Sequence, residues 1–154
     1  MSTVDVSSEI MIERPREVVA NFSANPDNAS AWYANIKSVE WRTSPPLQIG
    51  SQIAFVAHFL GRRMAYTYEI KEFVPLERLV MRTAEGPFPM ETFYGWKSLD
   101  SAKTRMTLRN RGFPTGFSSL LAPFMSMAVR RANQKDLARL KQLLEHPTDG
   151  ESSV

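Results

Sequence analysis

Residues 116–145, GFSSLLAPFMSMAVRRANQKDLARLKQLLE, decide the fold of this chain. Apolar side chains recur there at three- and four-residue steps, at Phe117, Leu120, Leu121, Phe124, Ala128, Ala132, Leu137, Leu140 and Leu144. This spacing predicts one long amphipathic helix, with a kink or a false start at Pro123, whose ring removes a backbone donor. A helix of this length reaches about 45 Å, so we expect it to lie across the concave face of a sheet.

The chain before this helix is predicted to form a sheet. Residues 4–13 alternate apolar and polar side chains, which is typical of a half-buried strand. Pro15 can begin a helix, Asn25-Pro26-Asp27-Asn28 ends it, and a short second helix is expected through Trp32. Further strands, joined by short turns such as Gly61-Arg62, are expected at residues 36–43, 51–60, 63–74, 77–84, 91–99 and 103–111. Consecutive strands of this kind form an antiparallel sheet.

Composition narrows the class of protein. The 154 residues suit one domain, which we expect at residues 1–145, followed by a disordered tail at 146–154. The chain has no cysteine, which excludes disulfides and thiolate chemistry. It has no apolar run of roughly 20 residues that could span a bilayer. Its N-terminus, MSTVDVSSEI, does not have the pattern of a secretory signal, so a cytoplasmic protein is the simplest fit.

Several stretches in this order resemble one family. They are the first strand with RPREVVANF (14–22), the helix pair up to Trp32, Gly50-Ser51, GRRMAYTYEI (61–70), GPFPMETFYGWKSL (86–99), KTRMTLRNRG (103–112) and DLARLKQLLE (136–145). Over residues 3–145 the chain resembles the START-like, polyketide cyclase/dehydrase-like (SRPBCC) superfamily. The resemblance implies an α+β helix-grip fold. In that fold a curved antiparallel sheet of about seven strands, with two short helices after the first, wraps around a long C-terminal helix.

The resemblance also implies an internal hydrophobic cavity between the sheet and this helix. The first half of the helix would then be its lid, and the second half a solvated strut. On residues 63–72, Met64, Tyr66, Tyr68 and Ile70 share one strand face, which we expect to face the helix. An ordinary filled core is the alternative. The candidate ligand-binding residues are Trp32, Tyr66, Tyr68, Met81, Tyr94, Trp96, Met106, Phe117, Leu121, Phe124 and Met125.

Chemistry-bearing motifs are scarce. His58 could act as an acid or base, although a surface role is the more ordinary interpretation of a lone histidine. One histidine in the domain and no cysteine argue against a zinc site, and no cofactor is expected. Arg82, Arg105, Arg109 and Arg111 alternate with apolar residues and are expected to face outward. An inward-facing arginine could hold a ligand carboxylate.

The second half of the helix is basic, with Arg130, Arg131, Lys135, Arg139 and Lys141. No interleaved aromatic residues accompany these charges, so we expect a solvated face and no nucleic-acid partner. No stable membrane insertion is expected. Transient contact with anionic lipid headgroups and a homodimer both stay open.

These observations predict a protein that binds or carries a small hydrophobic molecule, such as a lipid, a polyketide or an aromatic metabolite. One alternative is a cyclase/dehydratase-type enzyme in which Tyr66, Tyr68, Tyr94 or His58 is an acid/base or orienting group. Another is an interaction module without a ligand. Convergent polar groups inside an apolar pocket would favour the enzyme, and a filled interior would favour the interaction module.

Overall fold

A computed structural model describes residues 4–113 and 122–146. In these residues the strands are β1 (Val4–Ile12), β2 (Ile36–Trp41), β3 (Gln52–Phe59), β4 (Arg62–Val74), β5 (Arg78–Glu85), β6 (Met90–Asp100) and β7 (Lys103–Gly112). The helices are α1 (Arg16–Ala24), α2 (Ala29–Trp32) and α3 (Ala122–Glu145), with a 3-10 turn η1 (Pro26–Asn28) before α2. The predicted helix-grip fold class is confirmed, and each predicted strand lies within two residues of its observed bounds.

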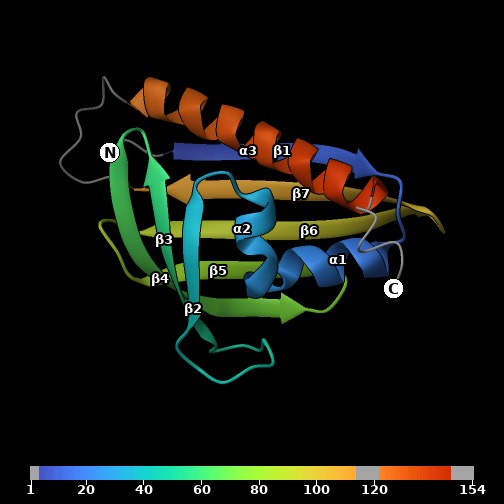
Figure 1. Cartoon of the computed structure of the whole chain (residues 1–154), viewed down its shortest axis with the longest axis horizontal. Coiled ribbons are helices and arrows are strands. Elements are labelled where there is room, and N and C mark those ends of the chain that lie inside the picture. Colours follow the sequence, from blue (N-terminus) through green and yellow to red (C-terminus); the bar gives the residue numbers. More distant parts are fainter. Residues whose placement is uncertain (1–3, 114–121, 147–154) are drawn as a thin grey trace.

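The described strands form one antiparallel sheet in the order β1-β7-β6-β5-β4-β3-β2. Strands β2 to β7 follow one another as a meander, and β1 closes the other edge by pairing with β7 from Val4 opposite Gly112 to Ile12 opposite Thr104. The helix pair α1 and α2 lies between β1 and β2 in sequence, and Figure 1 shows it on one face of the sheet. Strands β1 and β2 are thus the two edges of the sheet, and the helices lie on one of its faces.

The sheet is curled, and β4 is where much of the bend arises. The pairing of β4 with β5 shifts register between Thr67 and Tyr68 and again between Ile70 and Glu72. Such bulges bend a strand and increase its twist. In Figure 1, β2 and β3 run steeply across the direction of β5, β6 and β7. The sheet thus folds back over its own concave face and encloses space there.

The β3–β4 hairpin turns at Leu60 and Gly61, one residue earlier than the predicted Gly61-Arg62. Both turn residues have positive φ, 52° at Leu60 and 76° at Gly61. A two-residue hairpin of this twist needs left-handed backbone at both central positions. Glycine adopts that conformation freely, while Leu60 does so at a cost.

Helix α3 lies along β1 and next to β7 (Figure 1). The predicted residues 116–121 lie outside the described residues. Pro123 belongs to the described helix. The leucine stripe of α3, which we define as Leu137, Leu140 and Leu144, is buried against Ile12, Trp32 and the sheet.

The second half of α3 is anchored to the core, and the prediction of a solvated strut is wrong. Besides the leucine stripe, polar contacts fix this half, among them two to backbone carbonyls near the end of β1 and of α3 itself. The Arg14 guanidinium donates to the Leu144 carbonyl at 2.6 Å, and the Lys141 ammonium donates to the Met11 carbonyl at 2.9 Å. The charged residues between the leucines suggested a helix in solvent. They occupy the other faces of the helix, while every third or fourth position is buried.

We expect Leu140→Ala to lower the free energy of unfolding by about 2–5 kcal/mol, because it leaves a cavity in a packed core. Leu140 is fully buried. Leu99→Ala is the matched control at a side chain that is 38% exposed, and it should cost less than about 1 kcal/mol. Urea unfolding followed by circular dichroism measures both. Equal losses would show that α3 does not depend on the leucine stripe.

Candidate ligand-binding site

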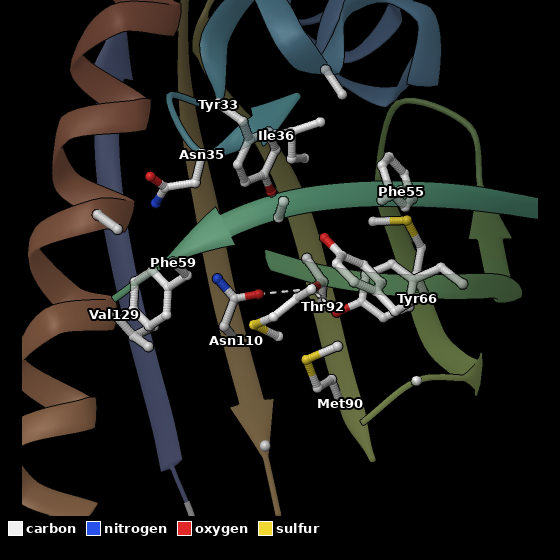
Figure 2. Close-up of a pocket in the computed structure, with 18 of the residues that line it drawn as sticks. Tyr33, Asn35, Ile36, Phe55, Phe59, Tyr66, Met90, Thr92, Asn110 and Val129 are labelled. Atoms are coloured by element: carbon white, nitrogen blue, oxygen red, sulfur yellow. Dashed lines mark hydrogen bonds between the residues drawn. The ribbon is translucent and has the colours of Figure 1, made fainter. Parts of the chain in front are cut away.

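A cavity of about 730 Å³ lies between the curled sheet and α3. Its lining comes from Val4 of β1, from the end of α1 and the segment from there to the start of β2, from strands β3 to β7 with the β3–β4 turn, from the loop after β5 and from one side of α3. Figure 2 shows side chains from these elements pointing into the space, with Phe55 and Tyr66 on one side and Val129 of α3 on the other. An apolar cavity, predicted from the resemblance, is therefore present in the described part of the chain.

Aromatic residues of β3 and β4 form one wall of the cavity. Phe55 and Tyr66 are opposite each other in the strand register, and their rings stack at 5.5 Å between centroids. Tyr68 meets Tyr66 edge to face at 5.1 Å. The side chains of Met81 and Met90 add flexible thioethers to the lining. This wall offers flat, polarisable surface to a ligand.

A chain of hydrogen-bonded polar side chains runs along the cavity wall from the sheet to α3. Tyr68 Oη lies 2.8 Å from Thr92 Oγ1, and Thr92 Oγ1 lies 2.6 Å from Asn110 Oδ1 (Figure 2). Asn110 Nδ2 then donates to Asn133 Oδ1 at 2.8 Å. We call these four residues, Tyr68, Thr92, Asn110 and Asn133, the polar chain. It links β4, β6, β7 and α3 through side chains alone.

Two further polar groups face the same space. The hydroxyls of Tyr33 and Tyr94 are 2.7 Å apart. Two phenols in contact use one of their protons for each other and leave one for another acceptor. On α3, one turn after Asn133, the Asp136 carboxylate accepts a hydrogen bond from the backbone N–H of Ala34 at 3.1 Å. Asp136 thereby ties α3 to the start of β2.

Burial controls the protonation of these groups. Removal from water raises the pKa of Tyr68 to about 12, and it also raises the pKa values of Tyr33, Tyr66 and Tyr94 well above their ordinary range. These phenols therefore stay protonated at neutral pH. Burial also raises the pKa of Asp136 to about 6, although the N–H of Ala34 favours the ionised form. Asp136 is thus a carboxyl group able to give or take a proton near neutral pH.

The structure places the predicted ligand-binding residues in three groups. Tyr66, Tyr68, Met81, Tyr94 and Met125 line the cavity. Phe117 and Leu121 lie outside the described residues. The remaining ones do not belong to the lining: they are Trp32, Trp96 and Met106, which are buried in the core, and Phe124, which is 70% exposed.

Position along the strand explains why Trp96 and Met106 are away from the cavity. Both share a strand face with lining residues, and they are paired with each other across β6 and β7. They pack beside α1, where the Trp96 indole donates to Ser23 Oγ at 2.9 Å, so that Ser23 belongs to the cavity lining while Trp96 lies behind it in the core. Alternation along a strand predicts which face of the sheet a side chain is on, but not whether that part of the face is packed against other side chains or lines a cavity.

Phe124 points away from the cavity because of its angular position on α3. Met125, Val129 and Ala132 line the cavity at steps of four and three residues. Phe124 precedes this row by one residue, which turns it about 100° around the helix axis. The apolar stripe read from the sequence placed Phe124 in the wrong phase.

Polar lining residues were missed by the sequence analysis. They include Thr92, Asn110, Asn133 and Asp136, together with Tyr33. The sequence nevertheless contains a pattern that could have identified these residues. Asn110 continues the alternation of Met106 and Leu108, and Asn133 and Asp136 fall on the same helix face as Leu137 and Leu140. A polar residue in an apolar period is expected to be buried and hydrogen-bonded.

The charged candidates lie mostly outside the cavity. His58 is exposed and does not belong to the cavity lining. Arg109 makes a bidentate contact with Asp5 at 2.7 and 2.8 Å, and Arg82 pairs with Glu91 at 2.6 Å. Arg111 does line the cavity, and its guanidinium lies 3.6 Å from the Glu91 carboxylate. Arg111 therefore already has an ion-pair partner on the protein, the Glu91 carboxylate.

Metal-binding clusters and membrane-spanning helices are both absent from the described residues. No group of three or more histidine, aspartate and glutamate side chains in residues 4–113 and 122–146 could hold a metal ion. None of the helices in the same residues is long and apolar enough to cross a membrane.

The family follows from comparison with known proteins. A family model described as polyketide cyclase / dehydrase and lipid transport matches residues 3–145. The chain therefore belongs to this family. A search of curated proteins found no match to this sequence.

Solved structures show the same fold at low sequence identity. The Zhui aromatase/cyclase from Streptomyces sp. R1128 is 14% identical, with a TM-score of 0.78 over 93% of this chain and 94% of that one. A START superfamily protein from Mycobacterium smegmatis is 12% identical, with a TM-score of 0.78 over 94% and 99% of the two chains. A Thermus thermophilus protein, TTHA0849, is 18% identical, with a TM-score of 0.80 over 94% and 99%.

We expect Asp136→Asn to remove a pH-dependent loss of stability. A carboxyl group whose pKa is raised on folding stabilises the protein below its unfolded pKa, and this stabilisation is lost as pH rises through about 6. The variant should match the unaltered protein at about pH 4 and be more stable by about 1–3 kcal/mol at about pH 7. Urea unfolding at both pH values measures the difference. A difference that does not change with pH would contradict burial as the cause.

Proposed function

We propose that this protein binds a small, largely apolar molecule that carries polar groups, and that it holds this molecule in the cavity between the sheet and α3. The observation that carries the proposal is the cavity of about 730 Å³, with an aromatic wall on one side and polar groups within it. Ligand pockets of small molecules span about 300–1,000 Å³ and combine apolar walls with a few placed polar groups.

The distribution of polarity favours a ring-shaped metabolite over a simple lipid chain. The aromatic wall of Phe55, Tyr66 and Tyr68 offers faces for stacking. The polar chain lies in the cavity wall together with the Tyr33–Tyr94 pair and Asp136, so this region suits a ligand with polar groups better than an aliphatic tail. A polyketide or an aromatic metabolite has both rings and oxygens. The family description and the aromatase/cyclase among the similar structures agree with this choice.

Native mass spectrometry of the protein from its own cells should reveal a bound small molecule, which denaturation would release. Ala132→Phe should abolish this binding, because Ala132 lines the cavity and a phenyl ring would fill part of it. Ala138→Phe is the matched control on the exposed face of the same helix and should bind as the unaltered protein does.

An empty protein that also fails to take up a fluorescent apolar probe would contradict the proposal. Equal loss of binding in both variants would indicate a folding defect, which circular dichroism would detect.

A second candidate function is catalysis of the cyclase or dehydratase type. It is favoured by Asp136, whose pKa near 6 suits proton transfer, and by its position beside the Tyr33–Tyr94 pair at the cavity. For an enzyme, Asp136→Asn should still bind the substrate and accumulate it unconverted. Mass spectrometry would then find a precursor on the variant that differs from the compound on the unaltered protein. The same compound on both would support a carrier.

Other predictions from the sequence stay predictions. Transient contact with a membrane surface is supported by Phe124 and Met127, which are 70% and 51% exposed, and by Arg130 and Arg131, which are exposed on the same turns of α3. A homodimer and a cytoplasmic location rest on the sequence alone. The interaction module without a ligand is less well supported, because the interior is not filled.

A further inference from the structure

Asp136 places a buried carboxyl group in the cavity wall. Asp136 is only 3% exposed, and no other aspartate or glutamate belongs to the part of the lining that the structure describes. No lysine or arginine of the described residues forms an ion pair with it. The exposed ammonium group of its neighbour Lys135 acts on it only from beyond ion-pair distance. Buried charges in proteins are usually paired, because removing an unpaired charge from water is costly.

The two oxygens of the Asp136 carboxyl group have different surroundings. Oδ1 accepts the backbone N–H of Ala34 at 3.1 Å, and Oδ2 has no hydrogen-bond partner among the described residues. The amide nitrogen of Asn133 also lacks a partner there, but it is closed off from any probe, whereas Asp136 Oδ2 keeps accessible surface. We call Asp136 Oδ2 the free oxygen. Because Asp136 lines the cavity, a molecule in the cavity can reach the free oxygen.

The other ionisable groups of the described lining are phenols and arginines. The phenols stay protonated at neutral pH, because burial raises their pKa values. Arg62 and Arg63 are exposed to solvent beside the β3–β4 turn, and Arg111 is paired with Glu91. Asp136 is therefore the one source of negative charge in the described lining, and the lining gives it no cation.

We propose that the ligand carries a protonated amino group that binds to Asp136, and that the cavity selects hydrophobic amines over neutral molecules of the same shape. An ammonium group matches the free oxygen, because it offers only donors and a charge opposite to that of the carboxylate. The apolar part of the ligand would lie on the aromatic wall of Phe55 and Tyr66. This inference rests on the proposed function, because it names the chemical class of the ligand in the same cavity.

Charge separates an amine from an alcohol at this position. A neutral hydroxyl group can also donate to the free oxygen, but it leaves the charge of the carboxylate uncompensated. An ammonium group compensates that charge and favours the ionised form of Asp136. Binding of the amine and protonation of Asp136 therefore oppose each other. The affinity for the amine should fall as the pH is lowered through about 6, the pKa of Asp136 in the empty protein.

The compounds 9-(aminomethyl)anthracene and 9-anthracenemethanol form a matched pair of fluorescent probes. They have the same three-ring frame and differ in an ammonium group against a hydroxyl group. We expect the ratio of their dissociation constants at neutral pH, alcohol over amine, to be about ten-fold higher for the unaltered protein than for Asp136→Asn. Glu17→Gln is the control, because it removes one negative charge from an exposed position of α1 outside the lining. It should leave the ratio unchanged.

The titration of Asp136 itself gives a test that needs no variant. In protein labelled with ¹³C at the aspartate carboxyl groups, the bound amine should lower the pKa of Asp136 by about one pH unit from its value of about 6. The bound alcohol should not lower it. The phenols and arginines of the lining keep their charge state over this pH range, so they do not produce such a difference. A merely structural role of Asp136 would not distinguish the two probes.

The outcomes separate the inference from the proposed function. If neither probe binds and a fluorescent apolar dye does not bind either, the proposed function fails together with the inference. If the dye binds, the proposed function stands, and the inference is overturned by any of three results. These are failure of the amine to bind, an equal ratio in the unaltered protein and Asp136→Asn with an unchanged pKa of Asp136, and an equal drop of the ratio in Glu17→Gln, which would show a general effect of net charge.

Discussion

Burial of the leucine stripe of α3 is the constraint on which the rest of the structure depends. Leu137, Leu140 and Leu144 are inserted into the core, and Arg14 and Lys141 fix the same half of the helix to the end of β1 through backbone carbonyls. Because the helix is rigid, anchoring one half also fixes where its other half lies over the sheet. The cavity lies under that other half, where Met125, Val129 and Ala132 face the sheet without filling the space.

The polar chain holds α3 to the sheet in the half of the molecule that contains the cavity, as the leucine stripe does in the packed half. It joins α3 to three strands of the sheet across a region where apolar contact is incomplete. Such bonds depend on direction, so they define the distance between helix and sheet more narrowly than apolar packing does. The helix is therefore kept at a defined separation from the sheet, and the cavity does not collapse.

Sequence pattern predicted the elements well, because strand alternation and helical spacing are local properties. Residues 63–72 show both its success and its limit. Tyr66 and Tyr68 were assigned to the correct face, yet the same reasoning carried Trp96 and Met106 into the site. Whether an inward side chain meets another side chain or empty space depends on where α1 and α3 cross the sheet, and no local pattern holds that information. Asn133 and Asp136 were within reach of the sequence, since both interrupt an apolar stripe, but their partners on β7 and before β2 were not.

The buried amide nitrogen of Asn133, which has no hydrogen-bond partner among the described residues, and the Asp136 carboxyl group, whose pKa is raised, have one physical consequence in common. Each is a polar group whose burial costs free energy of folding. A protein that carries such groups at a cavity wall is less stable empty than it would be with an apolar lining. A bound molecule that pairs with an accessible group of this kind adds its binding free energy to the stability of the folded state. Under the proposed function, a ligand that pairs with the Asp136 carboxyl group would therefore stabilise the folded protein more than an apolar ligand of similar shape.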